Sequence, residues 1–147
     1  MIELATCSWR KFHPAMGVPV RITLGKPPRW FAHPHEEIRQ LAPPRKVLRI
    51  ADSDWEEFRR KYRHHLYRMT PERLQRIFDE ISEKHGGRRL VLLCFEGRVE
   101  DCHRGEFASW WQRQTGEQVP ELERTNEEQT TAAQPALFDE LPREERT

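Results

Sequence analysis

The chain is poor in cysteine and has no long apolar run. Its three cysteines cannot all pair with one another, and no apolar stretch approaches the roughly 20 residues that span a bilayer. The start at Met1 also lacks the basic, apolar and small-residue order of a secretory leader. These absences predict a cytoplasmic protein with reduced thiols and no membrane association.

Several familiar site signatures are missing as well. The chain has no Walker loop, no glycine-rich dinucleotide turn and no His-Glu-x-x-His helix. The cofactor, if there is one, is therefore unknown from the sequence. A thiol phosphatase loop needs an arginine six positions from its cysteine, and neither Cys7 nor Cys94 has one there. Zinc could take thiolates and an imidazole from Cys7, Cys94, Cys102 and His103. Because no Cys-x-x-Cys knuckle exists and adjacent Cys102 and His103 would seldom both reach one ion, we predict no metal site.

The charges of the chain are strongly divided. Residues 1–116 hold 22 of the 25 Lys and Arg residues but only 15 of the 24 Asp and Glu residues. The near-neutral total therefore hides a basic body, long enough for one compact domain, and an acidic tail. A basic body suits polyanions such as nucleic acid or nucleotides, although an excess of Arg on helix surfaces is also ordinary solvation.

Strand-like runs are spread over the whole body. Short apolar runs predict strands at 1–5, 47–50 and 89–94, the last as a central strand covered on both faces. Residues 7–34 are rich in Pro, Gly and aromatic residues without helical period, so we expect a long irregular loop there. With the helices described next, this order predicts an α/β fold: a three-layer sandwich with a small, mostly parallel sheet.

Four helices are expected among these strands. A short one at 35–41 is followed by a helix capped by Asp52 or Ser53, then by one capped by Thr70, and the last runs over 102–115. The expected buried faces are Trp55, Phe58, Tyr62 and Leu66 for the second helix, and Leu74, Ile77, Phe78 and Ile81 for the third. Apolar residues three or four apart on each helix are the basis of this prediction.

Polar and reactive side chains lie at the expected strand ends, where open parallel sheets bind ligands. The last helix would also begin at this edge, and its free N–H groups attract anions. Arg104 adds a bidentate clamp for phosphate or carboxylate. The predicted catalytic residues are Cys94, Glu96 and His103, and the predicted anion or ligand contacts are Arg104, Arg10, Ser8 and Cys102.

Three of these residues have more than one interpretation. Cys94 is either a nucleophile or a small buried apolar side chain at the end of its strand. Glu96 is either a general base or half of a structural ion pair with Arg104 or Arg10. His103 is an acid or base, a metal ligand, or a surface residue of the first helical turn.

Two segments resemble a known family. Leu93-Cys94-Phe95-Glu96 followed by Cys102-His103-Arg104 is similar to the Leu-Cys-x-Glu and Cys-His-Arg signature of the domain-of-unknown-function 488 (DUF488) family. The early segment from Thr6 to Phe12, with Met16 to Arg21, is similar to a subgroup found in actinobacteria and their phages. The resemblance spans most of residues 1–115, and it implies a small cytoplasmic α/β protein with a site at the signature residues.

The long loop interleaves cations with aromatic rings. Arg21, Lys26 and Arg29 precede Trp30, a combination that offers charges to phosphates and a ring to an unstacked base. We predict these four residues as nucleic-acid contacts. In the alternative interpretation, Trp30 and Phe31 pin a proline-rich loop to the core.

The tail carries a short apolar peptide. Gln134-Pro135-Ala136-Leu137-Phe138 resembles the peptide with which bacterial polymerases and repair proteins bind the replication sliding clamp. There the Gln amide bonds the rim and Leu-Phe fills an apolar pocket, so we predict Gln134, Leu137 and Phe138 as partner contacts. In the alternative interpretation, Leu137, Phe138 and Leu141 fold back onto the domain. The expected organisation is a basic domain at 1–116, a flexible acidic linker at 117–133, the clamp-binding peptide at 134–141 and a short end at 142–147.

Two functional classes follow. The first is a DNA repair or replication protein that docks on the sliding clamp and presents its basic domain to nucleic acid or a nucleotide-like anion. The second is a stand-alone cytoplasmic enzyme acting on a small phosphorylated or nucleotide-like metabolite. Nothing in the sequence names a bond that is made or broken.

Overall fold

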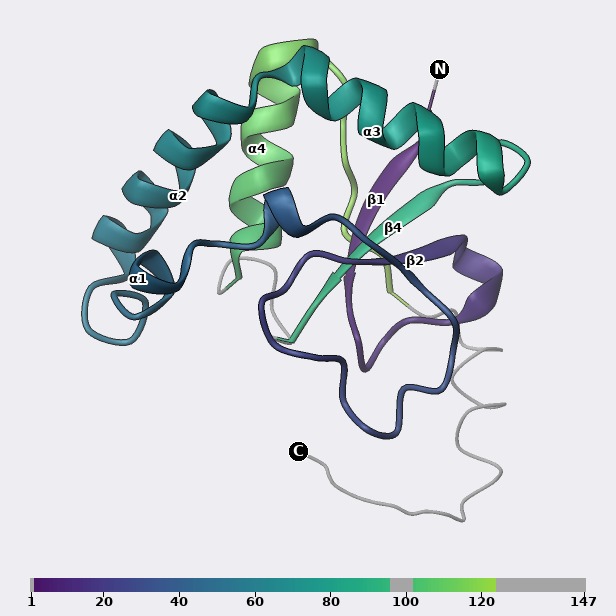
Figure 1. Cartoon of the computed structure of the whole chain (residues 1–147), viewed down its shortest axis with the longest axis horizontal. Helices are drawn as coiled ribbons and strands as arrows, with labels where there is room; N and C mark the ends of the chain where they lie inside the picture. The colour runs from purple at the N-terminus through teal and green to yellow at the C-terminus, as the bar shows by residue number, and fades with distance from the viewer. Residues whose placement is uncertain (1, 96–101, 124–147) are drawn as a thin grey trace.

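A computed structural model of the 147-residue chain describes residues 2–95 and 102–123 (Figure 1). The strands are β1 (Leu4–Ser8), β2 (Val18–Arg21), β3 (Glu36–Glu37) and β4 (Leu90–Cys94). The helices are α1 (Arg45–Leu48), α2 (Trp55–Met69), α3 (Pro71–Lys84) and α4 (His103–Thr115), with short 3₁₀ turns at Pro14–Met16 and Arg39–Leu41. This arrangement confirms the α/β class predicted from the sequence.

The four strands pair in parallel, in the order β1-β4-β2-β3. β4 lies between two neighbours, so that Leu90 is in register with Leu4 of β1 and with Val18 of β2. All five residues of β4 are buried, because the strand is covered on both faces. The central strand predicted at 89–94 is therefore confirmed. The carboxyl ends of β1, β2 and β4 lie next to one another at the same end of the sheet.

Helices α2, α3 and α4 cover one face of the sheet (Figure 1). Asp54 caps α2 by accepting a hydrogen bond from the Glu57 N–H, and Thr70 caps α3 by accepting one from the Arg73 N–H. The predicted apolar faces do form the core: Phe58, Tyr62, Leu66, Leu74 and Phe78 are buried, and Trp55, Ile77 and Ile81 pack partly buried beside them. Each fully buried side chain of this size contributes about 1.5–3 kcal/mol to stability.

The opposite face of the sheet is covered by irregular segments. A second buried cluster joins the loop after β1 to β4, and its members are Cys7, Trp9, Phe12, Met16, Val91 and Leu93. Phe31 packs against this cluster, with its ring centroid 4.7 Å from that of Trp9. The third layer of the sandwich thus consists of loops rather than helices.

The chain continues past α4 along the outer edge of the sheet. The Thr6 N–H of β1 donates to the Pro120 carbonyl at 2.8 Å, and the Leu122 N–H donates to the Thr6 carbonyl at 2.8 Å. The domain boundary expected at residue 116 therefore needs correcting, since residues 117–123 belong to the domain. The linker was predicted from the residue composition of this segment, and composition does not show backbone pairing of this kind.

The structure also corrects several local predictions. Strand β2 lies inside the stretch 7–34 that was expected to be a loop. Residues 35–41 form β3 and a 3₁₀ turn in place of a helix, and 47–50 belongs to α1 and the turn after it rather than to a strand. The first strand continues to Ser8, and α2 is capped by Asp54, one or two residues later than predicted. Within the described residues, no helix is both long and apolar enough to cross a membrane.

Candidate functional site

Several predicted site residues meet where β4 ends and α4 begins. Cys94 is the last residue of β4, and Cys102 occupies the N-cap position before His103, the first residue of α4. The two sulphur atoms and a His103 ring nitrogen lie within 4.8 Å of one another, and all three residues are buried. Because β4 is the central strand of a parallel sheet, its end is where such a cluster can form.

His103 is buried and neutral. Its Nε2 lies 2.7 Å from the Ile22 carbonyl oxygen, so Nε2 carries the proton and donates it. Nδ1 is then the nitrogen with a lone pair, and it lies 3.7 Å from Cys102 Sγ. Burial lowers the pKa of His103 to about 4, against a weaker opposing effect of the Ile22 hydrogen bond. Burial excludes the interpretation of His103 as a surface residue.

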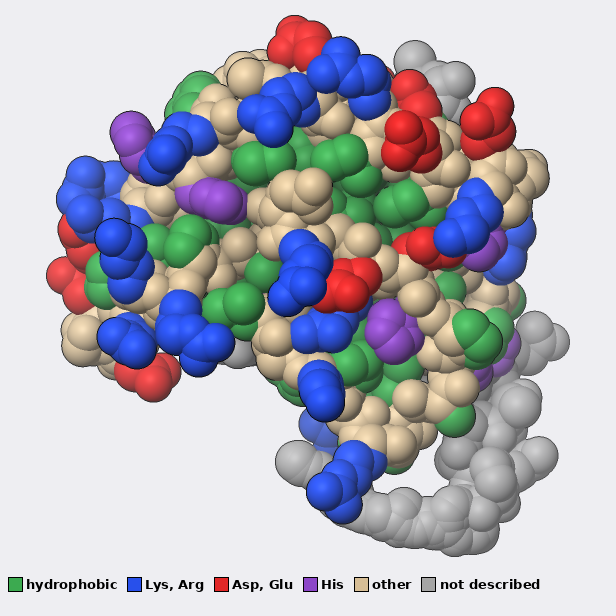
Figure 2. Space-filling model, in the orientation of Figure 1, with side chains coloured by type: hydrophobic (Ala, Val, Ile, Leu, Met, Phe, Trp, Pro, Cys, Tyr) green, Lys and Arg blue, Asp and Glu red, His purple; other side chains and the backbone are tan. Residues whose placement is uncertain are grey.

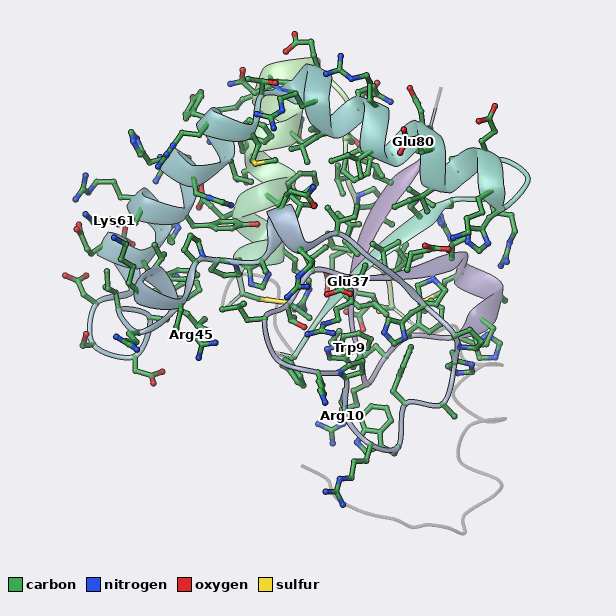
Figure 3. The ribbon with its side chains drawn as sticks, in the orientation of Figure 1. Trp9, Arg10, Glu37, Arg45, Lys61 and Glu80 are labelled. Atoms are coloured by element: carbon green, nitrogen blue, oxygen red, sulfur yellow. A yellow bond between two sulfur atoms is a disulfide. The ribbon has the colours of Figure 1, made fainter. Side chains whose placement is uncertain are left out.

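Cys94 and Cys102 are bonded through their sulphur atoms, with Cα atoms 7.3 Å apart (Figure 3). Disulfides usually hold the two Cα atoms about 4.4–6.8 Å apart. The Arg104 Nη1 group donates a hydrogen bond to Cys94 Sγ at 3.0 Å. A guanidinium in this position stabilises the thiolate form once the cysteine is reduced.

The reasoning behind the prediction of no metal site has to be corrected. Adjacent Cys102 and His103 do reach one place, because the N-cap side chain and the first helical side chain both turn toward the end of β4. Cys7 is not part of this cluster, since its Sγ lies 3.6 Å from the Leu122 carbonyl oxygen. Burial also raises the pKa of the Cys7 thiol to about 12, so it stays protonated.

Arg104 is fully buried and holds a carboxylate of the chain itself. Its Nε and Nη2 groups donate to the two carboxylate oxygens of Glu121 at 3.0 and 2.9 Å, which is a bidentate pair. Thr6 adds a hydrogen bond from its hydroxyl to Glu121 Oε1 at 2.7 Å. The guanidinium group of Arg104, which we predicted would bind an external anion, is thus paired with Glu121. Glu121 lies in the segment that we predicted as the linker.

The other residues predicted at the strand ends make different contacts, although Ser8 of β1 is in register with Cys94 of β4. The Ser8 hydroxyl oxygen accepts a hydrogen bond from the Lys11 N–H at 3.3 Å and so serves the turn after β1. Arg10 is exposed and extends away from the sheet, while Trp9 beside it lies inside (Figure 3). Glu96 lies outside the described residues, and its predicted role stays a prediction.

The cations and rings of the long loop divide into two groups. Arg21 fixes the backbone after β2, because it donates to the Thr23 carbonyl at 3.1 Å and to the Leu24 carbonyl at 2.7 Å. Lys26, Arg29 and Trp30 are exposed, and Trp30 keeps 62% of its surface in solvent. Phe31, not Trp30, packs the loop onto the core.

An apolar cavity of about 310 Å³ lies beside the cysteine and histidine cluster. Its lining includes rings from Trp55, Phe58 and Phe95 and the polar side chains of Thr23 and His103. Thr23 follows β2 and Phe95 follows β4, so the cavity lies at the carboxyl ends of these two strands. This is the position in which open parallel sheets bind ligands.

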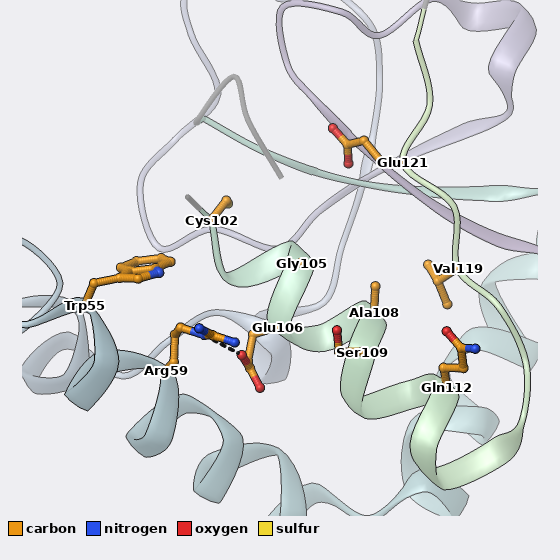
Figure 4. A pocket seen from close by; sticks show the side chains of 10 residues that line it. All are labelled: Trp55, Arg59, Cys102, Gly105, Glu106, Ala108, Ser109, Gln112, Val119 and Glu121. Carbon is orange, nitrogen blue, oxygen red and sulfur yellow. Dashed lines mark hydrogen bonds and ion pairs between the residues drawn. The ribbon is translucent and has the colours of Figure 1, made fainter. Parts of the chain in front are cut away.

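A second cavity of about 430 Å³ shares Trp55 and Cys102 with the first (Figure 4). It lies between α2, α4 and the segment that carries Glu121. Glu106 of α4 projects toward Arg59 of α2, and their side chains form an ion pair at 3.0 Å. The second cavity is therefore more polar in its lining residues than the first.

Glu106 is a site residue that sequence reasoning missed. Its side chain is only 4% exposed, and it pairs with Arg59 and Arg63 at 3.0 Å each and with Arg113 at 3.9 Å. The sequence did contain an indication of it. Arg59 and Arg63 are four residues apart on α2, so they share one helical face on which a carboxylate could pair with both. The Glu106 carboxylate thus joins α2 to α4 through ion pairs with side chains of both helices.

Comparison with known proteins gives a family match. Residues 21–115 match the family model described as the Active DUF488-N3 subclade, a range that contains β3, β4, helices α1 to α4 and the cysteine and histidine cluster. No curated protein and no solved structure matches the chain. Gln134, Leu137 and Phe138 lie outside the described residues.

Proposed function

The chain belongs to the DUF488 family, and we propose that it binds a nucleobase-bearing anion in the apolar cavity at the carboxyl ends of β2 and β4. We propose that this binding serves DNA repair or replication, with docking on the sliding clamp through Gln134, Leu137 and Phe138. The observation that carries the ligand proposal is the aromatic lining of the cavity of about 310 Å³ beside His103.

The size and lining of this cavity suit a flat heterocycle. Small-molecule sites in proteins have volumes of about 300–1,000 Å³ and are mostly apolar with a few polar groups. Trp55 and Phe95 contribute rings to the lining, and Phe95 keeps 45% of its surface exposed although it follows a fully buried strand. Exposed rings beside a cavity support stacking with a base, a contact that tolerates any base.

Cations flank the lining residues of the cavity. Lys26 follows the lining residue Gly25, and Arg49 follows the lining residue Leu48, and both cations are exposed. Figure 2 shows further Lys and Arg side chains gathered over α1 and α2 on the same face. Charges placed in this way would pair with the phosphates of a ligand whose base occupies the cavity. Arg104, by contrast, supports the site from inside through Glu121.

The ligand proposal is tested by fluorescence anisotropy with a labelled single-stranded oligodeoxynucleotide. Trp55→Ala removes a ring from the cavity, and we expect affinity to fall by roughly five- to a hundredfold, because stacking contributes about 1–3 kcal/mol per base. Tyr67→Ala is the matched control, since Tyr67 is an exposed ring of the same helix outside this cavity. Trp30→Ala separately tests the loop.

The pattern of the three variants decides the location of the site. A loss confined to Trp55→Ala supports the cavity, and a loss confined to Trp30→Ala moves the site to the loop and refutes the cavity. Equal affinity in all three variants and the parent chain would refute both. Lys26→Ala should also weaken binding less at high salt than at low salt, because its contribution is electrostatic.

Clamp docking needs a separate experiment because it rests on the tail sequence. The full chain is titrated against the sliding clamp of its source organism, alongside a Gln134/Leu137/Phe138 triple-alanine variant. Micromolar or tighter binding, about 8 kcal/mol, that the variant loses would support docking. Equal binding by the two chains, or none by either, would refute it.

A second candidate function is supported by the modest volume of the cavity. At about 310 Å³ it lies at the low end of small-molecule sites, a size that suits a single nucleotide-like metabolite better than a strand. Competition by a nucleoside monophosphate distinguishes the two candidates. If the nucleoside monophosphate displaces the oligonucleotide when both are present at the same concentration of nucleotides, the free metabolite is favoured as the ligand. If it displaces the oligonucleotide only weakly, the nucleic-acid strand is favoured.

A further inference from the structure

We propose that, in the reduced protein, Cys94, Cys102 and His103 bind one zinc ion at the edge of the apolar cavity. The inference concerns the side chains at the end of β4 and the start of α4, and it does not depend on the nature of the ligand proposed above. It changes the chemistry that the site can perform, because Cys94 and His103 then act as ligands rather than as nucleophile and base.

The donor atoms converge as a metal site requires. The two sulphurs and the imidazole nitrogen lie within 4.8 Å of one another, and all three residues are buried. The two sulphurs are joined as a disulfide in this structure, so zinc would bind only after that bond is reduced, and two zinc–sulphur bonds of about 2.3 Å at a tetrahedral angle would then place the sulphurs about 3.8 Å apart. The Cα separation of 7.3 Å between the cysteines is wide for a disulfide, so the two sulphurs can move apart to take up an ion once the bond is reduced.

The groups behind these donors have the arrangement found around metal ligands. A zinc-binding histidine commonly donates its second ring N–H to a carbonyl or carboxylate, which fixes the tautomer and ring direction. His103 does this through Nε2 and the Ile22 carbonyl at 2.7 Å, so its Nδ1 lone pair faces the sulphur of Cys102. This contact leaves Nδ1 as the ring nitrogen available for ligation.

The second cysteine has a matching support. Arg104 donates to Cys94 Sγ at 3.0 Å, a contact that stabilises a thiolate, and Glu121 balances the charge of the guanidinium. Two thiolates would in turn balance the charge of one zinc ion. A set of two sulphurs and one imidazole favours zinc over magnesium or calcium, which prefer oxygen ligands.

The number of protein ligands indicates the type of site. Structural zinc sites usually have four protein ligands, whereas catalytic sites have three and keep one position for water or substrate. Cys102 and His103 line the cavity of about 310 Å³, so a molecule in that cavity would be next to the ion. We therefore infer a zinc site of the open type, able to activate water or polarise a substrate.

The test measures metal content and ligand identity directly. The full chain is purified with a phosphine reductant, loaded with zinc, freed of excess ion and assayed by mass spectrometry for metal. We expect about one zinc per chain, and a cobalt-loaded sample should show the absorption of thiolate-to-cobalt charge transfer. Cys94→Ala, Cys102→Ala and His103→Gln should each weaken zinc binding by more than the roughly hundredfold loss that removal of an outer-shell partner causes.

Cys7→Ala is the matched control, because Cys7 is a buried cysteine outside the cluster, and it should keep the affinity of the parent chain. If a variant fails to fold, the zinc content and the cobalt absorption of the parent chain still test the proposal. Less than a tenth of an equivalent of zinc, with no cobalt–thiolate absorption in the reduced parent chain, would overturn the proposal. Equal zinc affinity in the parent chain and the Cys94→Ala and Cys102→Ala variants would overturn it too.

Discussion

Removal of the Glu121 carboxylate should destabilise the domain far more than its position near the end of the described chain suggests. Glu121 accepts two hydrogen bonds from Arg104, whose side chain is fully buried, and a third from the Thr6 hydroxyl. Breaking a buried ion pair from one side costs about 3–5 kcal/mol. Since the Glu121 side chain is 17% exposed, we take the lower end and expect Glu121→Ala to cost about 3 kcal/mol.

The matched control is two residues further along. Glu123 pairs with Lys11 at 3.0 Å, but both side chains of that pair are more than a third exposed. Glu123→Ala should therefore change the free energy of unfolding by about 0.5 kcal/mol or less. The pair of variants separates burial of the carboxylate from the general loss of a negative charge in this segment.

The assay is urea denaturation of the reduced protein followed by tryptophan fluorescence, with the dependence on urea compared among variants. A loss of about 3 kcal/mol should also lower the melting temperature by about 10 °C for a domain of this size. Equal, small losses for Glu121→Ala and Glu123→Ala would refute the buried pairing. An Arg104→Met/Glu121→Met double variant should recover much of the loss, because no buried charge is left to satisfy.

Three further predictions concern the fold. Hydrogen bonds from His85, and less strongly from Lys84, lower the pKa of Glu36 below 4.5 in the folded state. Stability from Glu36 is therefore present above pH 4.5 and lost as pH falls through the lowered folded value, and Glu36→Gln should flatten the acid side of a plot of stability against pH. Gly17→Ala should cost about 2 kcal/mol or more in denaturation experiments, because φ is 145° and an added Cβ would meet the Arg89 carbonyl oxygen; no measurable cost would contradict this. Since burial raises the pKa of Cys7 to about 12, native alkylation of Cys7 should stay slow from pH 7 to 9 and become fast in urea, as a mass-spectrometric time course would show.

Helices α2, α3 and α4 and the central strand could be predicted because their patterns are long and unambiguous. The face of α2 repeats apolar residues over four turns, and Thr70 followed by Pro71 marks the start of α3. Val47 to Ile50 shows the limit of this method. A run of four apolar-rich residues fits either a strand or one helical turn, and here it follows two prolines into α1, leaving Leu48 43% exposed.

Strand β2 was hidden by a proline in its middle. Pro19 lacks an N–H group, and prolines are rare in the middle of a sheet. The structure accommodates Pro19 because β3 pairs only with Val20 and Arg21, so that Pro19 has a strand neighbour on one side, in β4. A single sequence does not contain this information, since it depends on how far a separate strand extends.

The candidate site was predictable in part for the same physical reason. Cys94, Cys102, His103 and Arg104 adjoin the central strand and the last helix, both of which have strong patterns. Glu121 and Trp55 join them through tertiary packing alone, since neither is near the cluster in sequence. The ion pair between Arg104 and Glu121 is an example, because it links the start of α4 to a segment whose composition resembles that of a flexible tail.

The pairing of residues 120–122 with Thr6 also sets an upper limit on the distance between the domain and residues 134–138. A chain spans at most about 3.6 Å per residue, so the eleven steps from Glu123 to Gln134 reach about 40 Å. Had the domain ended at residue 116, the same peptide could have extended about 65 Å from it. If the proposed clamp docking holds, Glu123 would lie within about 40 Å of the ring, a distance of little more than one helical turn of DNA.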